Sequence, residues 1–127
     1  MSIGRLSSML LVLLAALGLA SAAPSAVRSG VYGTVLAGPT RPVCVESEPC
    51  YEPVRVTLVF SRLATGKEAA RTRSNKQGRF RLALPAGYYA VRTVERIGID
   101  RSVAPRRVHV RTGRFTRIVF RIDTGIR

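Results

Sequence analysis

Apolar and polar residues alternate with a period of two through most of the chain after residue 29, and the three-to-four spacing of an amphipathic helix is not found there. Residues 54–60 show the alternation most clearly. One parity of this segment holds Val54, Val56, Leu58 and Phe60, and the other holds Arg55, Thr57 and Val59. This pattern is typical of a strand with one face against a core and the other face in water.

Segments of this kind are separated by turn signals at regular intervals. We expect seven strands, around residues 30–36, 54–60, 68–74, 79–84, 88–92, 106–111 and 114–122. The residues predicted to face inward are Val31, Gly33, Val35, Phe80, Leu82, Leu84, Tyr89, Val91, Val108, Val110, Ile118, Phe120 and Ile122. Segment 68–74 lacks large apolar residues and carries charge, which predicts an edge strand.

Two turns frame the strand at residues 79–84. Residues 75–78 end in Gly78, which is free to take a positive φ, and residues 85–87 reverse the chain again. The number of strands, their alternation and the chain length predict an all-β fold: a seven-stranded antiparallel Greek-key sandwich, with a small barrel as the alternative.

The first residues have a different pattern. Arg5 is followed by an apolar run at residues 9–20 and then by small residues, which is the order of a secretory signal peptide. The run is too short for a bilayer-spanning helix, which takes roughly 20 apolar residues; a buried helix or an uncleaved anchor is the alternative. We expect a signal peptide at residues 1–22, a flexible leader at 23–29 and one domain at 30–127, in the periplasm or outside the cell.

Cysteine use agrees with export. Cys44 and Cys50 are the only two cysteines, and an even pair in an exported chain predicts a disulfide. Zinc is the competing interpretation, but a zinc site needs more ligands than this chain offers. The same loop contains Glu46, Glu48 and Glu52, which we interpret as a solvated tip that offsets nearby arginines, with calcium binding as the alternative.

The balance of charge is strongly basic. The chain holds 21 lysines and arginines, 7 acidic residues and a formal net charge of +14; without Arg5 the mature chain has 20 basic residues against 7 acidic ones, a net +13. Such a charge favours anionic partners and carries no information about the fold. The alternative is that the arginines only keep an exported protein soluble.

Six arginines occupy those alternate positions of the predicted strands that we expect to face water. They form the predicted anion-binding set, which is Arg79, Arg81, Arg92, Arg107, Arg117 and Arg121. Guanidinium groups pair with phosphates and carboxylates through two parallel hydrogen bonds. Which of the six share a face depends on the strand order, which alternation does not provide.

The turn and core residues also form a recognisable series. It runs from Gly30, Gly33 and Val35, through the Thr-Arg-Ser-Asn turn that leads to Gly78 and Phe80, to Leu-Pro-Ala-Gly-Tyr-Tyr at residues 84–89 and a terminal strand pair. This series resembles the carboxypeptidase regulatory-like domains, a branch of the transthyretin-like or prealbumin-like sandwiches. Asn75 stands where that family usually has aspartate. The resemblance implies a prealbumin-like sandwich that serves as a non-catalytic module.

Catalytic chemistry has little support in the sequence. His109 is the only histidine and lies on the exposed parity between Val108 and Val110, so it has no second histidine to orient it as a base. We expect no catalytic residues, no metal site, no cofactor and no small-molecule substrate. The predicted function is an exported binding module for an anionic polymer or an anionic membrane surface, and the alternative is a structural domain that docks on an acidic protein.

Overall fold

The computed structural model describes residues 28–127, which form eight β-strands and, within that range, no helix. The predicted signal peptide and residues 23–27 of the predicted leader lie outside the described residues. The strands are β1 (Gly30–Gly38), β2 (Glu52–Pro53), β3 (Thr57–Arg62), β4 (Glu68–Arg73), β5 (Arg79–Ala83), β6 (Gly87–Thr93), β7 (Ser102–Val110) and β8 (Phe115–Asp123).

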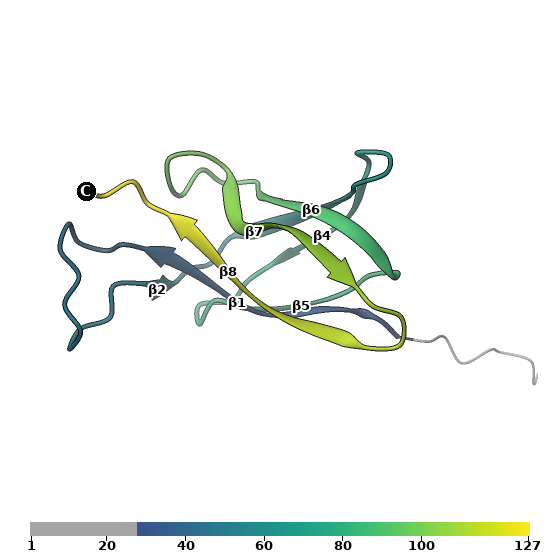
Figure 1. The fold of residues 1–127 in the computed structure, drawn as a ribbon, viewed down its shortest axis with the longest axis horizontal. Coiled ribbons are helices and arrows are strands. Elements are labelled where there is room, and N and C mark those ends of the chain that lie inside the picture. The colour runs from purple at the N-terminus through teal and green to yellow at the C-terminus, as the bar shows by residue number, and fades with distance from the viewer. Residues whose placement is uncertain (1–27) are drawn as a thin grey trace, which may run out of the picture.

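These strands make one mixed, curled sheet in the order β2-β1-β8-β7-β6-β3-β4, and β5 pairs with β1 on the same edge as β2. The sheet curls where β7 meets β8, because the two strands pair only at Ala104 and Arg121. We call β2, β5, β1 and β8 the first half and β7, β6, β3 and β4 the second half. Figure 1 shows β6, β7 and β4 above β8, β1 and β5.

The core lies between the two halves. Phe60 of β3 and Phe120 of β8 are not on neighbouring strands, yet their ring centroids are 6.1 Å apart. The ring centroid of Phe80 of β5 is 5.5 Å from that of Phe120. Burial of one such side chain contributes about 2 kcal/mol. Most residues predicted to face inward are buried: Val31, Val35, Phe80, Leu84, Tyr89, Val91, Val108, Val110, Phe120 and Ile122.

The expectation of an antiparallel sheet is wrong at one pair. β1 and β8 run parallel along their whole length, from Gly30 opposite Phe115 to Gly38 opposite Asp123. The final strand reaches β1 after the chain has passed through the second half of the sheet, and not through a hairpin. Side chains alternate in the same way in both kinds of pairing, so the sequence pattern carries no sign of strand direction.

Two further details differ from the sequence prediction. The long loop contains the short strand β2, which makes eight strands where seven were expected, and β7 begins at Ser102. Val59, assigned to the exposed parity, is 0% exposed. It lies opposite Arg71 of β4 on one side and Arg92 of β6 on the other, and the aliphatic stems of such arginines shield an apolar neighbour from water.

Other local predictions are confirmed. β4 is an edge strand, at the end of the strand order. Asn75 organises its turn, because its Oδ1 accepts hydrogen bonds from the backbone N–H groups of Gln77 and Arg79, each at 2.9 Å. The predicted disulfide between Cys44 and Cys50 is present, with Cα atoms 5.6 Å apart. No helix within residues 28–127 is long and apolar enough to cross a bilayer.

Candidate anion-binding face

Four of the six predicted arginines gather around β1 on the outer face of the first half. The register places Tyr32 of β1 opposite Arg81 of β5 on one side and Arg117 of β8 on the other. Further along β1, Thr34 is opposite Arg79, and Leu36 is opposite Arg121. Since neighbouring strands are about 4.8 Å apart, the arginines of β5 and those of β8 form two rows about 10 Å apart with β1 between them.

We call this surface the β1 face and define it by Tyr32, Arg79, Arg81, Arg117 and Arg121. All four arginines are exposed, and the Tyr32 side chain is 39% exposed. Within residues 28–127, ion pairs join Arg41 to Glu48, Arg71 to Glu68 and Arg127 to Asp123, so none of them involves the β1 face. Its guanidinium groups therefore keep their hydrogen-bond donors available to an outside anion.

Aromatic rings hold two of these arginines in place. The Arg81 guanidinium carbon lies 3.8 Å from the ring centroid of Phe115, and that of Arg121 lies 5.3 Å from the ring centroid of Tyr51. A guanidinium stacked on a ring keeps its N–H edge free for a carboxylate or phosphate. Its side chain is also partly ordered before any ligand binds, which lowers the entropic cost of binding.

A shallow hollow of about 290 Å³ opens in the centre of the β1 face. Its lining includes Tyr32, Gly33 and Thr34 and three of the four arginines, Arg79, Arg81 and Arg117. Gly33 permits the close approach of β1 to β8, because a Cβ on Gly33 would lie 1.7 Å from the backbone oxygen of Ile118. A side chain at this position would therefore force β1 and β8 apart at the hollow.

The remaining two arginines of the predicted set lie on the other half of the sheet. Arg92 is on β6, and Arg107 is on β7 opposite Ala90. Acidic groups share this surface. The hydrogen bond from Arg71 lowers the pKa of Glu68, and the charge of Arg92 lowers it further.

Glu95 is a second acid on this half. Burial raises the pKa of Glu95, but hydrogen bonds from the backbone N–H and the hydroxyl of Thr57 bring it below its usual value, and the charge of Arg73 acts in the same direction. The outer surface of the second half is therefore of mixed charge. The predicted set divides into four arginines on the β1 face, which have no acidic partner within residues 28–127, and two on the second half, of which Arg92 lies near Glu68.

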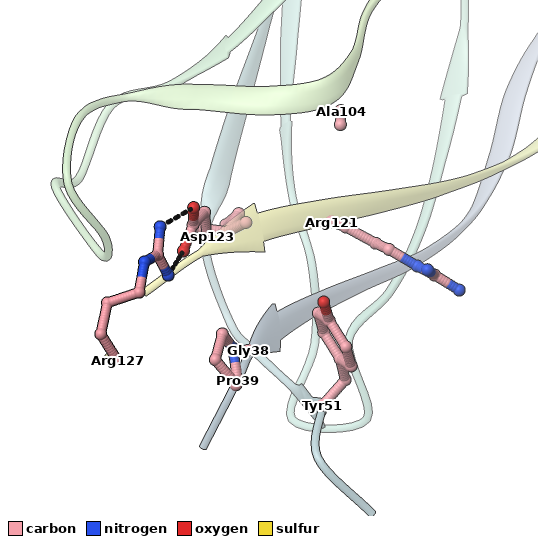
Figure 2. Close-up of a pocket in the computed structure, with 8 residues that line it drawn as sticks. Gly38, Pro39, Tyr51, Ala104, Arg121, Asp123 and Arg127 are labelled. Carbon is pink, nitrogen blue, oxygen red and sulfur yellow. Dashed lines mark hydrogen bonds and ion pairs between the residues drawn. The ribbon is translucent and has the colours of Figure 1, made fainter. Parts of the chain in front are cut away.

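Another hollow, of about 330 Å³, lies at the C-terminal end of β8 (Figure 2). Asp123 and Arg127 face each other across its edge, at 3.2 Å between carboxylate and guanidinium, while Arg121 extends away beyond Tyr51. The Arg127 guanidinium lowers the pKa of Asp123, so the carboxylate stays ionised and neutralises this arginine. One arginine that lines this hollow, Arg121, is not neutralised, whereas three such arginines line the hollow of the β1 face.

Sequence reasoning missed Tyr32 of the β1 face and the two rings, of Phe115 and Tyr51, that contact its arginines. Tyr32 has the opposite parity to Val31 and Val35, so alternation alone could have placed it on the exposed face. No sequence signal pairs Arg81 with Phe115, because the two residues meet only through the register of β5, β1 and β8. Within residues 28–127, no group of three or more His, Cys, Asp or Glu side chains is arranged to hold a metal ion.

Comparison of the chain with models of protein families and with curated proteins gave no match.

Proposed function

We propose that this protein is an exported, non-catalytic binding module, and that the β1 face binds an anionic polymer. The proposal includes a signal peptide at residues 1–22 and a Greek-key sandwich of the carboxypeptidase regulatory-like type. The disulfide supports export, because such bonds persist in oxidising compartments. The two facing halves of the sheet and the shared core support the sandwich.

The binding proposal rests on the arrangement of four arginines around Tyr32. Arg79, Arg81, Arg117 and Arg121 flank Tyr32 in two rows, and none of them is neutralised by an acidic residue of the described part of the chain. A linear polyanion that follows β1 meets guanidinium groups on both sides. The attraction is mostly electrostatic and is therefore screened by salt over roughly 8 Å at physiological ionic strength.

The test is binding to heparin, to anionic lipid vesicles and to nucleic acid, each at low and high salt. We expect binding to weaken steeply with salt. Arg79→Gln with Arg81→Gln removes two charges from the β1 face and should weaken heparin binding about thirtyfold, given roughly 1 kcal/mol for each exposed ionic contact. Arg92→Gln with Arg107→Gln removes two charges from the second half and should have a much smaller effect.

Equal losses in the two variants would show that only the net charge matters, and the β1 face would then not be the site. Binding that ignores salt would contradict the electrostatic basis.

A docking domain for an acidic protein is the second candidate, because carboxylates on a protein surface satisfy the same guanidinium groups. Pull-down with the intact protein distinguishes the two. One stoichiometric acidic partner, lost in the Arg79→Gln and Arg81→Gln variant, would favour the docking domain, and capture by heparin without such a partner would favour the polymer.

A further inference from the structure

A hairpin joins β7 to β8, but the two strands do not pair with each other near this hairpin. Their only paired residues, Ala104 and Arg121, lie at the far end of the two strands. Figure 1 shows β7 and β8 separated near the hairpin. The opening there is a hollow of about 380 Å³ lined by His109, Arg111, Arg114, Phe115, Thr116 and Arg117.

Basic groups dominate this hairpin hollow. Three arginines and the histidine contribute to its lining, and no carboxylate does. None of these four side chains takes part in an ion pair within residues 28–127. The hollow at the end of β8 differs, because Asp123 neutralises Arg127 there.

His109 is held in a defined orientation. It lies opposite Tyr88 in the β6–β7 register, and the two rings stack with centroids 4.2 Å apart and an interplanar angle of 5°. Tyr88 is 61% exposed, so the stacked pair lies at the surface. Stacking occupies one face of the imidazole and leaves the nitrogens at its edge able to bond to a ligand.

Thr116 supplies a second, independent observation. Its hydroxyl oxygen is buried and has no hydrogen-bond partner within the described residues. Buried polar groups in proteins are nearly always hydrogen-bonded, and an unpaired one is costly. Thr116 lines the hairpin hollow, so an oxygen of a ligand bound there is a candidate partner for this hydroxyl.

We propose that the hairpin hollow is a subsite for one phosphate group, held by Arg111, Arg114 and Arg117 with His109 at the edge. Each guanidinium presents a planar fork of N–H groups that matches two phosphate oxygens. A phosphate has more acceptor oxygens and more charge than a carboxylate, so it satisfies three arginines better. The group is either free phosphate or a phosphate monoester on a larger molecule.

This subsite goes beyond the polymer-binding proposal. It lies between β7 and β8 at their hairpin end and shares only Arg117 with the β1 face. Variants at Arg79 and Arg81 test the face, and variants at Arg111 and Arg114 test the hollow. The two proposals can therefore fail separately.

The single histidine makes the test direct, because its imidazole C–H signals in a proton NMR spectrum can belong only to His109. The protein is titrated with inorganic phosphate, with glycerol 3-phosphate and with acetate, at physiological ionic strength and one fixed pH. We expect both phosphates to shift the His109 signals in a saturable way, and acetate to shift them far less. A monoester that binds more tightly than inorganic phosphate would identify a phosphorylated molecule as the ligand.

Arg111→Gln with Arg114→Gln should raise the phosphate concentration at half-saturation about a hundredfold or more, since the two substitutions each remove charge-assisted hydrogen bonds that contribute roughly 1.5–3 kcal/mol. Arg55→Gln with Lys67→Gln removes the same charge at exposed positions outside the hollow and should leave the titration unchanged. Arg79→Gln with Arg81→Gln should also leave it unchanged. His109 signals that do not respond to phosphate, that respond equally to acetate, or that lose their response equally in the Arg55 and Lys67 variant would overturn the proposal.

Discussion

Gly78 and Gly66 adopt nearly the same backbone conformation in two different environments. Their φ angles are +74° and +72°, a region that L residues with a side chain rarely adopt. A Cβ on Gly78 would lie 2.6 Å from the backbone oxygen of Val35, whereas a Cβ on Gly66 would meet nothing within 4 Å. The pair therefore separates the cost of backbone strain from the cost of a steric clash.

Gly78→Ala should lower the free energy of unfolding by about 3 kcal/mol, because strain and clash act together. Gly66→Ala should lower it by only about 1 kcal/mol, from strain alone. Urea unfolding followed by circular dichroism measures both. Equal costs in the two variants would mean that the backbone of β1 moves away from the turn, and that the approach of Gly78 to Val35 is not a tight constraint.

At the scale of elements, the segment between β1 and β2 is held at several points. β2 pairs with β1 at Leu36 and Ala37, and the backbone N–H of Thr40 donates to the carbonyl of Cys50 at 2.8 Å. Arg41 forms an ion pair with Glu48 at the tip, as expected of a solvated loop that offsets its own charge. The disulfide closes the same loop, with a sequence separation of 6 residues.

Replacement of both cysteines, Cys44→Ala with Cys50→Ala, should lower the free energy of unfolding by about 2 kcal/mol, because a short loop loses little chain entropy on closure. The protein should still fold, since neither cysteine belongs to the core cluster. Thermal unfolding of the variant measures the loss. Titration of native protein with a thiol reagent is the control, and two reactive thiols there would contradict the disulfide.

At the scale of the whole molecule, the excess of positive charge acts against compactness. The chain has a formal net charge of +14, and the three ion pairs within residues 28–127 all lie at the surface. Exposed pairs contribute on the order of 0–1 kcal/mol each, whereas like charges on one sheet face repel one another in the folded state. Repulsion should therefore exceed the attraction from the pairs.

The melting temperature should rise between low salt and about 0.5 M sodium chloride, because salt screens the repulsion among the arginines. Differential scanning calorimetry measures this shift. Replacement of all four arginines of the β1 face with glutamine should make the rise in melting temperature smaller. This result would show that repulsion among these arginines causes the rise. A melting temperature that falls with salt would mean that the ion pairs outweigh the repulsion.

Alternation along the chain determined by itself which side chains enter the core. Tyr89 and Val91 face inward while Tyr88 and Arg92 face outward, and the same holds for Phe80 against Arg79 and Arg81. Neighbours on a strand point to opposite sides whatever the strand pairs with, so this property needs no tertiary information. The turn at Gly78, the edge position of β4 and the pairing of Cys44 with Cys50 were predictable for similar local reasons.

Only the tertiary structure decided the direction and order of the strands. It placed β8 parallel to β1, set Arg81 and Arg117 on either side of Tyr32, and separated Arg92 and Arg107 from that face. It also buried Val59 between two arginines and opened the hairpin hollow beside His109. Each of these features joins residues that are distant in the sequence. The strand register brings these residues together. Many registers keep the same apolar residues in the core, and the alternation along the chain is identical in all of them, so the sequence pattern does not reveal which register forms.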